Sequence, residues 1–80
     1  GSEIYLKPMN LYLDEFPADL TFAEVMVLAQ KRGEVSLGVK IKKLEDDMSK
    51  NFGVHLIPEK NTQFSFTAED SIVVIAEDDT

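Results

Sequence analysis

Only one stretch of this sequence has the spacing of an amphipathic helix, and this limits the fold more than any other feature. Thr21 and Glu24 form a capping box, in which each side chain can bond the backbone N–H of the other residue. The helix is predicted to run to about Arg32, and Gly33 can end it in a left-handed conformation. Its predicted buried stripe is Phe22, Val25, Met26 and Ala29. Parallel strands need crossover connections, usually helices, so one helix predicts a mainly antiparallel sheet.

Several other segments have the alternation or the β-branched composition of strands. The clearest is residues 34–42, where Lys40 and Lys42 are expected on a solvated face. The opposite, buried face is expected to hold Val35, Leu37, Val39 and Ile41. Residues 72–76 (IVVIA) are apolar on both faces, so we expect them to form the central strand of the sheet. Shorter extended segments are predicted at residues 3–7, 10–13, 54–57 and 63–66.

A chain of 80 residues is long enough for one domain. Such a short chain buries only about 60% of the surface that it exposes when unfolded. Its core is therefore thin, and a partner subunit would add to its stability. We therefore predict a single α+β domain over residues 1–80. Its sheet is mainly antiparallel, with the amphipathic helix packed on one face. Gly1 and Ser2 are either native or left over from expression.

The composition argues against several classes of function. A net charge of −7 repels phosphate backbones, so we expect no nucleic-acid partner. With no cysteine, and with His55 as the one histidine, neither a zinc site nor a catalytic triad is expected, and we predict that the protein is not an enzyme. No apolar run approaches the roughly 20 residues of a membrane helix, and no signal peptide is recognisable. We expect a cytoplasmic domain without direct membrane insertion.

Three groups of side chains are candidates for binding. Lys31, Arg32, Lys40, Lys42 and Lys43 gather loosely, either as solvated charge or as a pocket for an anionic small ligand. Ala23, Val27 and Gln30 lie off the buried stripe of the helix, and they either face solvent or form a dimer interface. The acidic runs at residues 45–47 and 77–79 could supply calcium ligands but lack the alternation of an EF-hand loop, so the metal stays open. Residues 77–80 are expected to fray.

Several segments together, in order, resemble the C-terminal lobe of RCK domains, also called TrkA-C domains, of potassium channels and transporters. They are residues 3–8 (EIYLKP), 21–24 (TFAE), 32–35 (RGEV) with Leu37-Gly38, Pro58 with Lys60, Asn61 and Thr62, and 70–77 (DSIVVIAE). Tyr5, Tyr12, the Phe22 helix and the closing IAEDD are also similar to the plant Castor and Pollux type of ion channel. The chain has Ile57-Pro58 where the family often has Asn-Pro.

This resemblance implies a lobe that forms a homodimer and follows a Rossmann-type nucleotide-binding lobe of a membrane channel or transporter. It also implies that a ligand controls cation flux, usually of potassium, from the cytoplasmic face. The effector would be a nucleotide, a cyclic dinucleotide or calcium. The expected ligand contacts are Lys40 and Lys42, on the solvated face of residues 34–42, and Lys60, Asn61 and Thr62, in the loop after Pro58. The alternative is a purely structural dimerisation or protein-interaction domain that binds no small molecule.

Overall fold

The computed structural model describes residues 1–77, so of the acidic tail only Glu77 is covered, and residues 78–80 lie outside the described part. The strands are β1 (Ser2–Pro8), β2 (Ala18–Thr21), β3 (Val35–Lys40), β4 (Val54–Leu56), β5 (Gln63–Phe66) and β6 (Ser71–Glu77). The helices are α1 (Phe22–Gln30) and the short 3-10 helices η1 (Met9–Leu11), η2 (Lys42–Leu44) and η3 (Met48–Gly53). No helix within residues 1–77 has both the length and the apolar character needed to cross a membrane.

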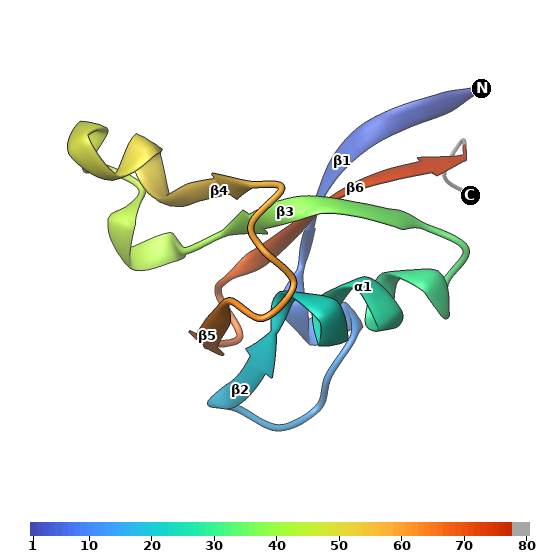
Figure 1. Cartoon of the computed structure of the whole chain (residues 1–80), viewed down its shortest axis with the longest axis horizontal. Coiled ribbons are helices and arrows are strands. Elements are labelled where there is room, and N and C mark those ends of the chain that lie inside the picture. The colour runs from blue at the N-terminus through green and yellow to red at the C-terminus, as the bar shows by residue number, and fades with distance from the viewer. Residues whose placement is uncertain (78–80) are drawn as a thin grey trace.

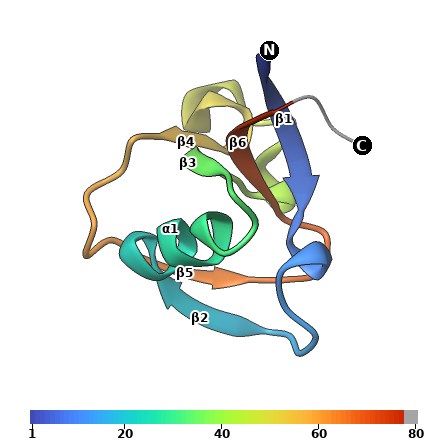
Figure 2. The ribbon, with the colours of Figure 1, turned by 90° about the vertical axis from the view of Figure 1, so that its right-hand side faces the viewer.

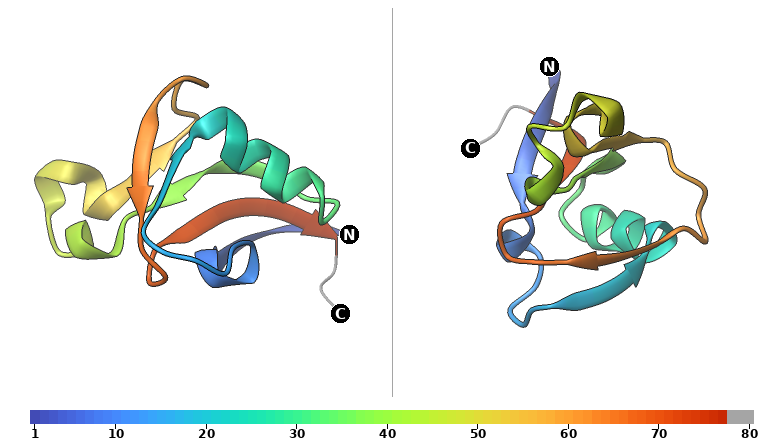
Figure 3. Two further views of the ribbon diagram at one scale, coloured as in Figure 1. Left: turned by 90° about the horizontal axis from the view of Figure 1, so that it is seen from below. Right: turned by 90° about the vertical axis from the view of Figure 1, so that its left-hand side faces the viewer.

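The strands form two antiparallel sheets rather than the single sheet expected. Four strands are hydrogen-bonded in the order β1-β6-β3-β4, and β2 pairs with β5 (Figure 1). Helix α1 lies between the two sheets and packs against β3 and β2 (Figure 2). The β2–β5 pair runs across the direction of β3 and β6 (Figure 3). The α+β class, the antiparallel sheet and the central place of β6 are confirmed.

The core lies between the four-stranded sheet and α1. Strand β6 contributes Ile72 and Val74, which are fully buried. The helix contributes Phe22, Val25 and Ala29, three of the four residues of the predicted stripe, and Met26 is half-buried beside them. Phe66 on β5 and Met9 after β1 close the core from the other sides. Burial of this stripe, more than intrinsic helix propensity, holds a nine-residue helix in place.

The ends of α1 follow from local sequence. The Thr21 hydroxyl accepts the N–H of Glu24 at 3.2 Å, and the Glu24 carboxylate accepts the N–H of Thr21 at 2.8 Å, as the capping box predicts. The helix ends at Gln30, two residues before the predicted end. Gly33 has a φ of 74°, which glycine adopts at little cost and which reverses the chain into β3.

The predicted alternation along β3 is wrong at its start. A register shift between Ser36 and Gly38 inserts Leu37 as a bulge, so Val35 is exposed and Ser36 is buried. Beyond the bulge the pattern holds, because Val39 is buried and Lys40 is on the opposite face. Strand β3 ends at Lys40, and Lys42 belongs to η2.

The extended segment expected at residues 10–13 is also different. Met9 begins the 3-10 helix η1, and its backbone oxygen accepts the N–H groups of Tyr12 and Leu13. The turn buries Met9 and brings the Tyr12 hydroxyl to Glu34, at 2.6 Å from the carboxylate. The alternation of apolar residues at 11 and 13 therefore reflects a tight turn and not a strand.

Candidate ligand site at the end of beta3

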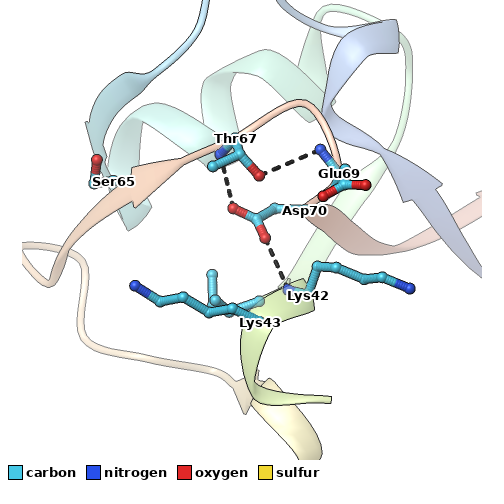
Figure 4. A pocket seen from close by; sticks show the side chains of 7 residues that line it. Lys42, Lys43, Ser65, Thr67, Glu69 and Asp70 are labelled. Carbon is cyan, nitrogen blue, oxygen red and sulfur yellow. Dashed lines mark hydrogen bonds between the residues drawn. The ribbon is translucent and has the colours of Figure 1, made fainter.

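Two small pockets adjoin where β3 ends. The first lies between η2 and the turn at residues 67–70, has a volume of about 160 Å³, and is drawn in Figure 4. It is lined by Ile41, Lys42, Lys43, Ser65, Thr67, Glu69 and Asp70. The second, of about 170 Å³, is lined by Leu6, Lys40, Lys42, Glu45, Glu69 and Ser71. Lys42 and Glu69 belong to both, so the two pockets share one wall.

Asp70 organises the first pocket, although its side chain is only 2% exposed. One carboxylate oxygen accepts the backbone N–H of Lys42 at 2.8 Å, and the other accepts the backbone N–H of Thr67 at 2.8 Å (Figure 4). Its backbone oxygen accepts the N–H of Met9 at 2.8 Å. Asp70 thus joins η2, the 67–70 turn and η1, and its two oxygens are already used. Its role is to hold the pocket in shape and not to act as a base.

Replacing Asp70 by asparagine is expected to lower the free energy of unfolding by about 2 kcal/mol, because one of the two amides then faces an NH2 group instead of a charged oxygen. Urea denaturation followed by circular dichroism measures the loss. The control is Asp19→Asn, since Asp19 is exposed on β2. Equal losses in the two variants would contradict this role for Asp70.

The lysines at this site differ in how far they are paired. Lys42 places its amine 2.9 Å from a carboxylate oxygen of Glu45, and this hydrogen bond together with the charge of Glu45 raises the pKa of Lys42 above its ordinary value. Within residues 1–77, Lys40 and Lys43 form no ion pair. The side chains of Lys42 and Lys43 leave η2 in opposite directions (Figure 4).

The charges of each pocket balance. The first pocket combines Lys42 and Lys43 with Glu69 and Asp70, and the second combines Lys40 and Lys42 with Glu45 and Glu69. Taken at their formal charges, two cations and two anions give zero in each case. Such a site suits a small polar group that carries both donors and acceptors. An anionic ligand would have to place its negative groups next to the lysine amines and its hydrogen-bond donors next to the carboxylates.

The expected ligand contacts do not all meet at one pocket. Lys40 and Lys42 line the second pocket together. Lys60, Asn61 and Thr62 lie in the connection from β4 to β5 and line neither of these two pockets. The backbone oxygens of Thr62 and Lys60 accept the N–H groups of Phe22 and Ala23 at 2.9 Å, so this loop completes the start of α1.

Sequence reasoning included Lys42 and Lys43 in a basic group but missed the other polar residues of the first pocket, namely Ser65, Thr67, Glu69 and Asp70. The one signal that could have found them is the segment 67–70 (TAED), since a threonine and an aspartate three apart before a strand favour a turn closed by side-chain to backbone bonds. The partner of that turn, the backbone of Lys42, is 28 residues away and gives no local signal.

The interface and metal candidates have the following places. Ala23 is half-buried, whereas Val27 and Gln30 are exposed on α1. Within residues 1–77 no group of three or more His, Asp or Glu side chains is arranged to hold a metal ion. In the run 45–47, Asp47 accepts the N–H of Ser49 at 3.0 Å and caps η3. The other acidic run extends into residues 78–79, outside the described part.

Comparison with known proteins adds no constraint on this site. The sequence matches no protein-family model, and no curated protein matches it.

Proposed function

We propose that this domain is a regulatory module that dimerises and senses a small ligand for a potassium or other cation channel or transporter. The observation that carries the proposal is where the segments that resemble TrkA-C domains fall in the fold. Residues 3–8 lie in the edge strand β1, residues 21–24 begin the one α-helix, and residues 70–77 lead into and form the central strand β6. The α+β class implied by the resemblance is also the class of this chain.

The size of the pockets supports a ligand held between two copies. Sites for drug-sized ligands occupy about 300–1,000 Å³. Each pocket at the end of β3 has only about half of the lower limit, 160 or 170 Å³, so one copy could enclose only part of a nucleotide or a cyclic dinucleotide. A second copy would supply the remaining surface.

The mechanism that fits this arrangement is a population shift. A ligand that contacts both copies binds more tightly to one relative orientation than to another, and it raises the population of that orientation. An upstream lobe attached to each copy would transmit the change to a pore. The domain contributes binding free energy to this process and carries out no chemical step.

Isothermal titration calorimetry tests the sensing role directly. We expect heat of binding from one of three probes, namely calcium chloride, ATP or a cyclic dinucleotide. If the probe that binds is ATP or the cyclic dinucleotide, Lys42→Ala should weaken its binding about tenfold, because a hydrogen bond to a charged group contributes about 1.5 kcal/mol or more. The matched control is Lys31→Ala, an exposed lysine at the end of α1 that lines neither pocket. Absence of heat from all three probes would contradict the sensing role.

A second candidate function is a structural dimerisation domain without a ligand. It is favoured by a different observation, the exposed apolar side chains on the four-stranded sheet, which need a covering surface whether or not a ligand binds. In that case calorimetry detects no heat of binding, and none of the three probes changes the association of the domain.

A further inference from the structure

One face of the four-stranded sheet is apolar but has no layer over it. Helix α1 and the β2–β5 pair both lie on the same side of this sheet (Figure 2). On the other side, which we call the outer sheet face, β1, β3, β4 and β6 present a patch of aliphatic side chains. It consists of Ile4, Leu6, Val35, Leu56, Val73 and Ile75. The first four have exposed fractions of 66%, 52%, 60% and 59%.

The register of the strands makes this patch continuous. Ile4 lies opposite Ile75, and Leu6 lies opposite Val73. Ile75 also has Val35 on its other side, so three strands meet at this position. An antiparallel sheet with one face in water normally has polar side chains on that face. An apolar outer face on both the central and the edge strands therefore indicates that a second layer covers it.

The strand residues at the two ends of the outer sheet face include one side chain of each charge. Lys40 lies opposite Ser71 at one end, and Glu77 lies opposite Ser2 at the other. Glu77 is six residue steps along β6 from Ser71, which corresponds to roughly 20 Å. Within residues 1–77, Lys40 has no ion pair, whereas its neighbour Lys42 already faces Glu45 and Glu69.

We propose that the outer sheet face binds a second copy of this chain, with Lys40 of each copy next to Glu77 of the other. The two-fold axis would lie in the plane between the two sheets, perpendicular to the strands. It exchanges the two ends of the face, so two Lys40–Glu77 pairs form. If the axis were instead parallel to the strands, Lys40 would lie against Lys40 and Glu77 against Glu77. The surface is thus complementary to itself in one orientation, which is what a homodimer requires. This inference rests on the dimerising part of the proposed function and names its surface.

The area of the outer sheet face gives a rough indication of how tightly two copies can bind. Four strands spaced at about 4.8 Å, of which β1 and β6 are roughly 20 Å long and β4 has only three residues, give a flat area of at most about 400 Å² per copy. Two copies would together bury about 800 Å², which is below the roughly 1,000 Å² of a stable interface, so we expect a weak, transient dimer with a dissociation constant of hundreds of micromolar. Sheets that pack face to face in this way lie about 10 Å apart.

Sedimentation equilibrium from about 10 µM to 1 mM tests the surface. We expect a monomer–dimer equilibrium in which Val35→Glu raises the dissociation constant at least tenfold. The matched control is Val27→Glu on α1, since Val27 is also an exposed valine, with an exposed fraction of 48% against 60% for Val35. Circular dichroism checks that each variant is folded, and Leu6→Glu replaces Val35→Glu if that variant unfolds. A strict monomer at 1 mM, or a dimer broken only by Val27→Glu, would overturn the inference.

A charge exchange tests the orientation. Lys40→Glu and Glu77→Lys are each expected to weaken the dimer about fivefold, because each removes two surface ion pairs. The double variant should return to within about twofold of the original, since the pairs are restored with reversed charges. These residues are roughly 20 Å apart within one copy, so restoration has to act between copies. Additive weakening in the double variant would rule out this orientation.

The same samples separate this inference from the sensing role. A dimer that Val35→Glu breaks, with no heat from calcium, ATP or the cyclic dinucleotide, supports the interface and contradicts sensing. Heat from one of these probes in a chain that stays monomeric at 1 mM supports sensing and overturns the interface.

Discussion

Replacing Glu34 by alanine is expected to lower the free energy of unfolding by about 3–5 kcal/mol, because it leaves Lys7, whose side chain is only 12% exposed, without its partner. Glu34 is only 5% exposed, and its carboxylate lies 2.7 Å from the amine of Lys7 and 2.6 Å from the hydroxyl of Tyr12. Arg32 is also close, at 3.5 Å. A domain of this length has a total stability of about 4–12 kcal/mol, so the loss should be easy to measure by urea denaturation.

The control for this substitution is Glu3→Ala, since Glu3 is exposed on β1 and its loss should change stability by no more than about 0.5 kcal/mol. If the two alanine variants lose the same amount, the cluster of Lys7, Tyr12 and Glu34 does not stabilise the fold. Glu34→Gln keeps the shape of the side chain and removes its charge. It should fall between the alanine variant and the unmodified chain.

The same cluster predicts how stability depends on pH. Burial alone would raise the pKa of Glu34, but the hydrogen bonds from Lys7 and Tyr12 and the charges of Lys7 and Arg32 outweigh it, so the pKa lies below its ordinary value of 4.5. A pKa lowered by folding gives a stabilisation that is present above pH 4.5 and is lost as the pH falls through the folded value. Urea midpoints between pH 3 and 7 should therefore fall less steeply in Glu34→Ala than in the original chain.

Replacing Phe66 by alanine is the second change with a large expected effect, about 3–5 kcal/mol of lost stability. Phe66 is fully buried between the sheets, and its ring stacks on that of Phe64 with 5.5 Å between the centres. Its removal opens a cavity where β5 meets the core, and β5 has only β2 as a neighbouring strand. The lost ring therefore weakens the attachment of both strands.

Thermal unfolding measures this effect against Phe52→Ala, the same substitution at a ring that is exposed in η3. A loss of about 3 kcal/mol corresponds to a fall in melting temperature of roughly 12–24 °C for a domain of 60–100 residues. The Phe52 variant should change by less than a third of this. Similar losses at the two positions would place the main core elsewhere than around Phe66.

The features that sequence alone predicted correctly are those with local causes. The capping box at Thr21 needs only two side chains three residues apart, and Gly33 needs only its own freedom at positive φ. The central place of β6 follows from composition, because a strand with neighbours on both sides is the most buried and IVVIA is the most apolar run of the chain.

The features that sequence missed depend on distant neighbours. The bulge at Leu37 lies in β3, which is hydrogen-bonded to β6 on one side and to β4 on the other. Gly38 allows the backbone of β4 to come close to β3, since a Cβ at this position would lie 2.1 Å from the backbone oxygen of His55. The β2–β5 pair joins segments about 45 residues apart in the sequence. Each strand has only four residues, which is too short for a clear alternation of apolar and polar side chains. At the site, alternation placed Lys40 correctly, while the role of Asp70 required knowing which backbone it would meet.

The pairing of the first strand with the last has a mechanical consequence. Ser2 lies opposite Glu77 in the antiparallel β1–β6 pair, so the two ends of the described chain emerge together at one corner (Figure 1). A force that pulls these ends apart acts on one β1–β6 residue pair at a time, so the hydrogen bonds between β1 and β6 break in sequence, starting at Ser2 and Glu77. Tension applied at this corner would therefore detach β1 at low force, before the layer of α1 is disturbed.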